Sequence, residues 1–290
     1  MLGWKYRNWL EALSEANFVT GKDILEGNIS LDTCNFFLYH DMDSAGIEEH
    51  LYPTLKIEEA LGIRSTTYLL VDDRVNTKQG EYFTYFPRES YYKRNLKELL
   101  KLQDSGFEFG YHVNATGRCK RLGDTVDPKE AYRIFLQDIK WFKEQGFDIR
   151  TMSAHGFKWF DNVRSDYDNY QLEYDATERG CSVVSQYHLS KKFLEAGGIR
   201  IEDLKDVTFG ETIWKRWHTI EVEDSISLLM DDSCGNWQQL SIEFLAKLIP
   251  HLKGCLMRIL THPISWTVVD GELEYKNREV SIRDGDVEGV

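Results

Sequence analysis

Residues that can bind a metal ion or transfer a proton follow four apolar segments of the chain. The segment Asn35–His40 (NFFLYH) leads into His40-Asp41-Met42-Asp43, and the segment Phe107–His112 (FEFGYH) ends in a histidine. Two later segments lead into His155-Gly156 and His262-Pro263. A single histidine at such a position more often has a structural role. Four such positions, with paired carboxylates at one of them, indicate a shared site.

The residue types in these four places suit metal-assisted hydrolysis. Neutral imidazole nitrogens and carboxylate oxygens suit Zn²⁺ or a similar divalent ion, and a catalytic zinc site keeps three protein ligands and one open position for water. The ion lowers the pKa of that water and polarises the carbonyl under attack. A second carboxylate can accept the proton of the water, while a separate histidine protonates the departing amine or alcohol. The expected cofactor is therefore a divalent metal ion, and Zn²⁺ is the leading candidate.

The elements that must position these residues alternate between short apolar strands and helices. Apolar runs predict strands at Asn35–His40, Thr66–Val71, Phe107–His112, 149–155, Ser182–Gln186, Ser225–Met230 and Cys255–Thr261. Helical spacing of apolar residues predicts helices at 50–61, Arg94–Ser105, from Asp127 to near Gly146, and Trp237–Leu252. The third of these helices has a strong start, because Asp127 can cap it and Pro128 suits its first position.

Strands that alternate with helices predict a parallel α/β arrangement. In a parallel β/α barrel the carboxyl ends of the strands converge on one face, and such folds hold their active sites there. No repeat, low-complexity tract or linker divides the chain, so residues 1–290 are expected to form a single domain.

The ordered motifs resemble those of the NodB-type polysaccharide deacetylases, and more closely those of divergent members found in surface-polysaccharide (O-antigen and capsule) biosynthesis loci. That group shares an H-D-x-D opening, a G-x-x-x-G-x-H segment, an H-G turn and a closing T-H-P-x-x-W. These correspond here to His40–Asp43, Gly106–His112, His155-Gly156 and Thr261–Trp266, and Met230–Trp237 resembles a D-S-x-G-x-W element. The likeness extends from about residue 33 to 268. It implies a distorted (β/α) barrel with its active site at the carboxyl ends of parallel strands.

The resemblance also implies roles for the motif residues. Asp41 would be the general base, Asp43 and His112 would be metal ligands, and His262 would be the acid that protonates the leaving group. Because Asp41 and Asp43 are separated here, whereas standard members have adjacent aspartates, the two roles could be exchanged.

The third metal ligand is where this chain departs from the wider family. Standard members place two ligand histidines four residues apart, but the residue four after His112 is Thr116. His155 is the candidate replacement, with His40 and Asn114 as alternatives.

Several further residues could contact a substrate. Arg118 belongs to a small basic patch and could bind a carboxylate or phosphate, as on a uronic acid or a nucleotide sugar, although a solvated loop is the commoner role. The other candidates follow expected strands and could orient His262, stack on a sugar or wall the pocket: Asp231, Asp232, Trp237 and Trp266.

Composition limits the other function classes. The net charge of −13 and pI of about 5.1 argue against a nucleic-acid partner, which would need a clustered basic face. No segment has the length of a signal peptide or a membrane span, so a cytoplasmic location is expected. The five cysteines are widely spaced and suit reduced, mostly buried thiols. The oligomeric state stays open.

The leading hypothesis is a metal-dependent hydrolase that removes an N-acyl (acetyl or formyl) or related amide group from a sugar or sugar nucleotide. One alternative is hydrolysis of a non-sugar amide on the same scaffold. Another is a catalytically silent carbohydrate-binding protein, because the usual second histidine is missing.

Overall fold

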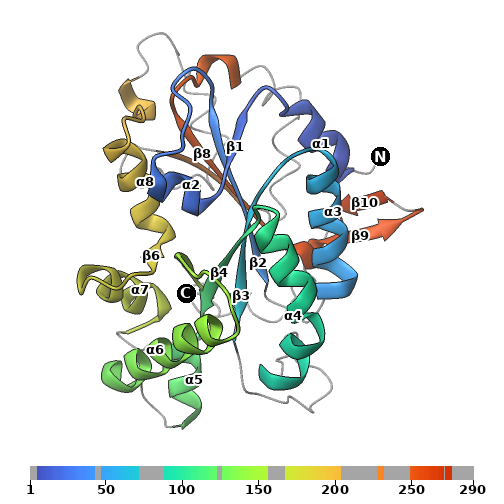
Figure 1. Ribbon diagram of the computed structural model, residues 1–290. Coiled ribbons are helices and arrows are strands. Elements are labelled where there is room, and N and C mark those ends of the chain that lie inside the picture. Colours follow the sequence, from blue (N-terminus) through green and yellow to red (C-terminus); the bar gives the residue numbers. More distant parts are fainter. Residues whose placement is uncertain are drawn as a thin grey trace, which may run out of the picture.

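The structure is a computed structural model that describes residues 5–42, 47–71, 88–122, 126–155, 167–203, 227–231, 249–270 and 272–275 (Figure 1). At its centre is an eight-stranded sheet whose strands pair in parallel. In chain order they are β1 (Asn17–Val19), β2 (Asn35–Met42), β3 (Thr66–Leu70), β4 (Glu108–Val113), β5 (Thr151–Ala154), β6 (Val184–Ser185), β7 (Ser227–Asp231) and β8 (Leu256–Thr261). Their order across the sheet is β6-β5-β4-β3-β2-β8-β7.

Strand β2 lies in the middle of this order and is buried along its whole length. Its first residues, Asn35–Phe37, pair with β1, and its last residues, Tyr39–Met42, pair with β3. On its other edge β2 pairs with β8. Elements from both ends of the described chain thus meet on one strand.

Helices connect and cover the strands. They are α1 (Tyr6–Ala12), α2 (Gly21–Glu26), α3 (Tyr52–Ala60), α4 (Arg88–Asp104), α5 (Ala115–Leu122), α6 (Pro128–Glu144), α7 (Asn169–Glu178) and α8 (Gln186–Glu195). A π-helical turn, η1 (Ile47–Leu51), precedes α3, and short 3₁₀ turns are η2 (Ile201–Asp203), η4 (Ile249–His251) and η5 (Pro263–Ser265). A separate antiparallel hairpin is formed by β9 (Trp266–Val269) and β10 (Glu272–Tyr275).

The sheet is curled, as the distance between two short side chains shows. Strands β5 and β2 are three positions apart in the sheet order. In a flat sheet this would separate them by about 14 Å. However, Ser153 Oγ on β5 lies 3.3 Å from Asp41 Oδ2 on β2. Contacts of this kind require the two strands to face each other across a concave surface, which we call the inner face.

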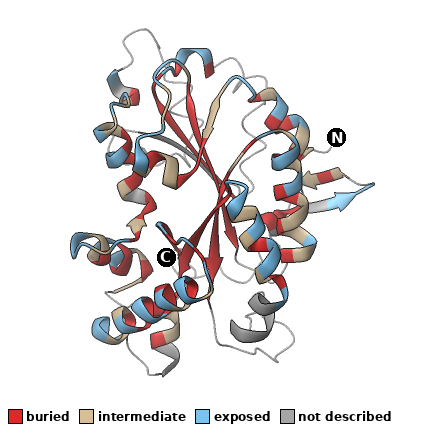
Figure 2. Ribbon diagram, viewed as in Figure 1, coloured by how far each residue is buried: buried red, intermediate tan, exposed pale blue. Residues whose placement is uncertain are grey.

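Alternation along the strands assigns side chains to the two faces, because successive residues of a strand point in opposite directions. On the inner face Phe37 and Tyr39 pack with residues of α2 and α8, among them Ile24 and Leu189. On the outer face Phe36 and Leu38 pack with α1, while outward residues of β3, β4 and β5 pack with α3, α4, α6 and α7. The sheet is accordingly the most buried layer of the molecule (Figure 2).

A buried polar cluster fixes the outer side of β2. Glu58 of α3 accepts hydrogen bonds from Tyr6 (2.5 Å) and Ser65 (2.5 Å), and its Oε1 lies 2.9 Å from His40 Nε2. The other ring nitrogen of His40 lies 2.5 Å from Thr261 Oγ1 on β8. Since His40 precedes Asp41 and Thr261 precedes His262, this cluster ties together the strands that carry two of the predicted catalytic residues.

Most of the predicted elements are confirmed. The strands at the four motif positions are present, α6 begins after Asp127, whose side chain accepts a hydrogen bond from the Lys129 N–H, and Gly106 (φ 103°) and Gly146 (φ 98°) follow the ends of α4 and α6. The parallel α/β, barrel-like arrangement is also confirmed.

Other predictions need correction. Only Val184–Ser185 of the strand expected at Ser182–Gln186 is extended, because Gln186 already begins α8. Most of the helix expected at Trp237–Leu252 lies outside the described residues, and its last part contains the 3₁₀ turn η4. The N-terminal helix α1, for which no prediction was made, belongs to the buried core, since its Tyr6 and Trp9 are fully buried.

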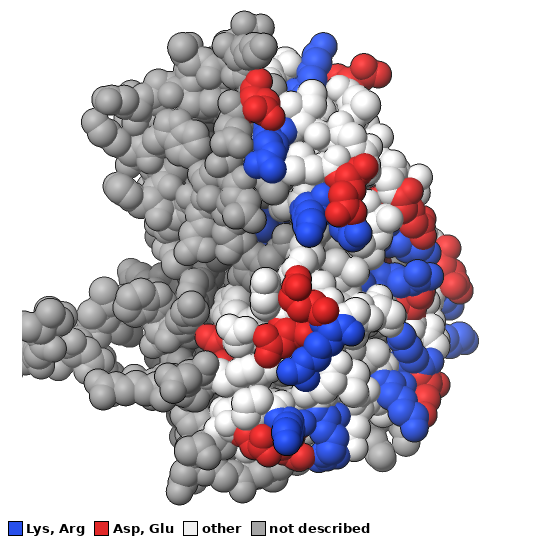
Figure 3. Space-filling model, turned by 90° about the vertical axis from the view of Figure 1, so that its left-hand side faces the viewer, with Lys and Arg blue, Asp and Glu red and all other residues white. Residues whose placement is uncertain are grey.

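The surface charges are mixed. Figure 3 shows basic and acidic side chains interspersed over the described part of one face. Several exposed charges pair within a helix, as do Arg133 with Glu130 and Lys192 with Glu195. No helix among the described residues is long and apolar enough to cross a lipid bilayer.

Candidate active site

Four of the five predicted centre residues stand at the carboxyl ends of sheet strands. Asp41 is the penultimate residue of β2, His112 is the penultimate residue of β4, and His155 and His262 directly follow β5 and β8. Asp41 and His112 are buried, whereas His155 and His262 are half-buried. The fifth, Asp43, lies outside the described residues.

Asp41 and His112 face each other on the inner face. Asp41 Oδ1 lies 3.8 Å from His112 Nδ1, and both side chains are less than 10 % exposed. This pair brings a carboxylate and an imidazole together although β3 separates their strands. The curl of the sheet makes this approach possible.

The hydrogen bond of His112 determines which of its ring nitrogens carries the proton. Its Nδ1 lies 3.0 Å from the backbone carbonyl oxygen of Ser153. A carbonyl oxygen can only accept, so Nδ1 must be the protonated nitrogen and donate. The neutral ring then carries its lone pair on Nε2. This is the tautomer that a metal-binding histidine adopts when a backbone carbonyl orients it.

His155 lies against His112. The two ring centroids are 5.0 Å apart and the rings are nearly perpendicular. The backbone of His155 is held on both sides, because its N–H donates to the carbonyl of Val113 (2.8 Å) and its carbonyl accepts from the Asn169 side chain (3.0 Å). Asn169 also accepts hydrogen bonds from the backbone and hydroxyl of Thr116. Thr116, which takes the position of the missing second histidine, therefore helps to anchor His155.

His262 follows β8 next to the end of β2. Strand β8 pairs with β2 through His40 and Thr261, so His262 leaves the sheet beside Asp41. Its backbone carbonyl accepts a hydrogen bond from the N–H of Ser265 in the turn η5 (2.8 Å).

The described side chains provide some, but not all, of the ligands that a metal ion would need. His112 has the appropriate tautomer, and the imidazole and carboxylate groups beside it are those that Zn²⁺ accepts as ligands. Among the described residues, however, no three histidine, cysteine, aspartate or glutamate side chains lie close enough to hold one ion. The expected ligand Asp43 is not among these residues.

His40 can be removed from the candidate metal ligands. Its side chain is fully buried on the outer face, and its two ring nitrogens contact Glu58 and Thr261. Asn114, the other alternative, is buried directly after β4.

Two of the predicted substrate contacts have partners within the fold. Trp266 is fully buried in the core under α1, where its ring packs edge-on against Tyr6 at 4.8 Å, so it does not line an open pocket. Arg118 binds both carboxylate oxygens of the buried Asp138 at 2.6 Å, and Tyr111 donates to the same carboxylate. Arg118 therefore joins α5 to α6 and β4.

The remaining predicted substrate contacts are not tested by the structure. Asp231 is the last residue of β7 and pairs with Leu260, but its side chain lies outside the described residues. Asp232 and Trp237 also lie outside them.

Behind Asp41 lies a chain of buried polar side chains that the sequence reading missed. Arg258 of β8 donates to Gln186 Oε1 (3.1 Å), Gln186 Nε2 donates to Ser153 Oγ (3.0 Å), and Ser153 Oγ donates to Asp41 Oδ2 (3.3 Å). All four side chains are buried. Arg258 offered a signal, because it is a charged residue within the apolar run Cys255–Thr261. Nothing local in the sequence singles out Gln186 or Ser153.

A second buried carboxyl group borders this chain. Glu173 of α7 accepts a hydrogen bond from the Gln186 backbone N–H (3.3 Å). Burial raises the pKa of Glu173 to about 8, and the negative charge of Asp41 adds to the rise, while hydrogen bonds and Arg258 act in the opposite direction. Glu173 is therefore mostly protonated at neutral pH.

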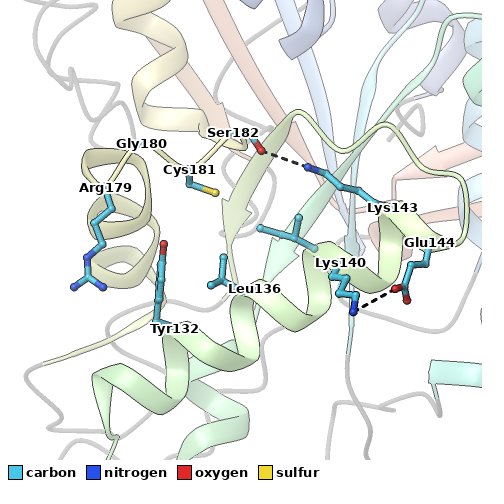
Figure 4. Close-up of a pocket in the computed structure, with 10 residues that line it drawn as sticks. Tyr132, Leu136, Lys140, Lys143, Glu144, Arg179, Gly180, Cys181 and Ser182 are labelled. Atoms are coloured by element: carbon cyan, nitrogen blue, oxygen red, sulfur yellow. Dashed lines mark hydrogen bonds and ion pairs between the residues drawn. The ribbon is translucent and has the colours of Figure 1, made fainter.

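A surface pocket of about 560 Å³ lies elsewhere, over α6 and the turn that follows α7 (Figure 4). Its lining includes Tyr132, Leu136, Lys143, Arg179 and Cys181. None of the predicted site residues lines it, so its position gives no support for a role in the chemistry predicted at the strand ends.

Comparison with known proteins does not assign the chain to a family. No model of a protein family matches the chain, and a search of curated proteins finds no match.

Proposed function

We propose that this protein is a metal-dependent hydrolase that removes an N-acyl group, such as acetyl or formyl, from a sugar or sugar nucleotide in surface-polysaccharide biosynthesis. The observation that carries the proposal is the buried Asp41–His112 pair, 3.8 Å apart at the carboxyl ends of two strands, with the His155 ring against it. Carboxylate and imidazole groups gathered at this edge of a parallel sheet suit metal-assisted hydrolysis.

Each residue has a distinct task in the proposed reaction. His112, His155 and Asp43 would hold a divalent ion, with Zn²⁺ the leading candidate. The bound ion would polarise the acyl carbonyl. Asp41 would accept the proton of the attacking water, and His262, from the neighbouring strand, would donate a proton to the departing amine.

The orientation of His112 supports this assignment. Its Nδ1–H is held by the Ser153 carbonyl, so the neutral ring carries its lone pair on Nε2, the nitrogen that would bind the cation. Asp41 accepts a hydrogen bond from Ser153 on Oδ2, which holds its carboxylate at the end of β2 beside His112.

Metal analysis of the purified protein tests the proposal. We expect about one divalent ion per chain, with loss of that ion in His112→Ala and His155→Ala. The matched control is His188→Ala, because His188 is partly exposed on α8 and pairs with Glu178 instead of contacting this site. Protein that binds no divalent ion with both histidines intact would exclude the proposed reaction.

A further inference from the structure

The buried side chains behind Asp41 form a hydrogen-bonded chain with one direction. The Arg258 guanidinium has only donors, so the group of Gln186 that faces it must be the amide oxygen. The Gln186 amide nitrogen is then turned to Ser153, where it donates to the hydroxyl oxygen. With its oxygen engaged in this way, Ser153 has its hydroxyl hydrogen directed to Asp41 Oδ2. The chemistry of the four groups therefore fixes each donor and acceptor.

The consequence for Asp41 is geometric. Oδ2 is held by Ser153 on one side, while Oδ1 lies near His112 Nδ1. The hydrogen bond to Oδ2 favours one rotation of the carboxylate about its terminal bond. Ser153 and Gln186 are 0–6 % exposed, so bulk water does not compete for their hydrogen bonds.

The positive charge of Arg258 suits its place at the donor end of these hydrogen-bonded side chains. Arg258 brings a positive charge onto the inner face, where it is 2 % exposed. The buried carboxyl group of Glu173 lies near this charge; burial raises its pKa to about 8, and Arg258 opposes this rise.

We propose that Gln186 is a positioning residue, which relays a hydrogen bond from Arg258 through Ser153 and so fixes the Asp41 carboxylate for proton transfer. This inference rests on the proposed function, in which Asp41 is the base. Gln186 is not a catalytic residue, since it reaches Asp41 only through Ser153.

Two substitutions interrupt the relay in different ways. Ser153→Ala removes the hydroxyl that donates to Asp41. Gln186→Glu keeps the size of the side chain and gives Arg258 a carboxylate to bind, but it replaces the amide donor with an acceptor. The Ser153 hydroxyl would then donate to the introduced carboxylate and turn away from Asp41.

Ser65→Ala is the matched control. Ser65 is also a fully buried serine whose hydroxyl donates to a buried carboxylate, that of Glu58 at 2.5 Å, but it lies in the outer-face cluster. It reports what the loss of a buried serine hydrogen bond does to the fold alone.

Steady-state kinetics of the zinc-loaded proteins with an N-acetylated amino sugar form the first arm of the test. We expect kcat to fall about 10- to 100-fold in Ser153→Ala and Gln186→Glu, the usual loss when hydrogen bonds that orient a functional side chain are removed, with KM unchanged. Ser65→Ala should keep the wild-type kcat. Wild-type kcat in either relay variant, or an equal loss in Ser65→Ala, would overturn the inference.

Crystal structures of the same variants form the second arm, which needs no activity. We expect the Asp41 carboxylate to rotate away from its present position in Ser153→Ala and Gln186→Glu and to stay in place in Ser65→Ala. An unmoved Asp41 in both relay variants overturns the positioning role. If the wild-type protein shows no turnover, the proposed function fails, and the crystal structures still decide whether the relay positions Asp41.

Discussion

Among single residues, Asp41 has the environment that says most about the proposed chemistry. This carboxylate is buried, contacts His112 and receives a hydrogen bond from a chain of polar side chains that ends at Arg258. Burying a carboxylate is costly unless it is paired and hydrogen-bonded. One carboxylate oxygen accepts the hydrogen bond of Ser153, and the other faces His112 at 3.8 Å on the inner face, which fits the role of a base that we propose for Asp41.

The roles assigned to the two aspartates can be separated by isosteric substitution. Asp41→Asn should lower kcat by about 10²- to 10⁴-fold while the protein keeps its metal, because the amide cannot accept a proton. Asp43→Asn should lose the metal. Kinetics together with metal analysis of each variant would check this, and the reverse pattern would mean that the two residues exchange roles.

Glu173 predicts how stability depends on pH. Its pKa is about 8 in the folded protein, against an ordinary value of 4.5, so the folded state binds one more proton than the unfolded state between these two values. The free energy of unfolding should therefore fall as the pH rises from about 5 to 8, with a contribution from this group of up to about 1.4 kcal/mol per pH unit.

Urea unfolding at pH 5, 6.5 and 8 would measure this effect. Glu173→Gln cannot titrate at this position and should show a shallower dependence on pH than the wild type. Parallel pH profiles for the two proteins would contradict the assignment of a protonated Glu173.

At the scale of elements, the approach of β3 to β4 depends on a glycine. Gly110 lies under the ring of Tyr68, and a Cβ atom at this position would meet that ring at 2.5 Å and the Thr151 carbonyl oxygen at 2.8 Å. Because the Thr151 oxygen belongs to the backbone of β5, the whole strand would have to move to make space for the added Cβ. This close contact lies one inward position before His112 on β4.

Gly110→Ala should therefore destabilise the protein by about 1–3 kcal/mol, the usual cost of overpacking a core. Gly62→Ala is the comparison, since Gly62 has φ 72° but nothing within 4 Å of an added Cβ, which leaves only the backbone cost of the left-handed conformation, about 1–2 kcal/mol. Thermal unfolding of both variants provides the measurement. Equal stability of Gly110→Ala and the wild type would show that the strands can separate without cost.

Elements were also the level at which sequence prediction worked best. The strands before Asp41, His112, His155 and His262 have local signals, namely short apolar runs that end in polar residues. Helix α6 has a capping aspartate and an early proline. By contrast, α1, β1 and α2 were missed, although Thr20 and Asp23 form a capping box at the start of α2. Their place in the fold depends on packing against β2 and β8, which lie far along the chain.

At the scale of the whole molecule, the contacts that define the inner face are long-range. Ser153 meets Asp41 across 112 residues of sequence, and Arg258 meets Gln186 across 72. No local pattern predicts such pairs, so the sequence indicated the ends of the strands but not the side chains that orient them. For the same reason no local pattern indicates that Trp266 packs against Tyr6 or that Arg118 binds Asp138.

We propose that the residues at the carboxyl ends of these strands hydrolyse an N-acyl group on a sugar. The most direct measurement is the release of acid and free amine from a panel of N-acetyl and N-formyl amino sugars and sugar nucleotides, with small non-sugar amides in parallel. We predict equal amounts of acid and amine from at least one sugar substrate, loss of both products after chelation, and their recovery when Zn²⁺ is returned. A metal-loaded protein that binds these sugars but releases neither product, or that releases products only from the non-sugar amides, would contradict the account.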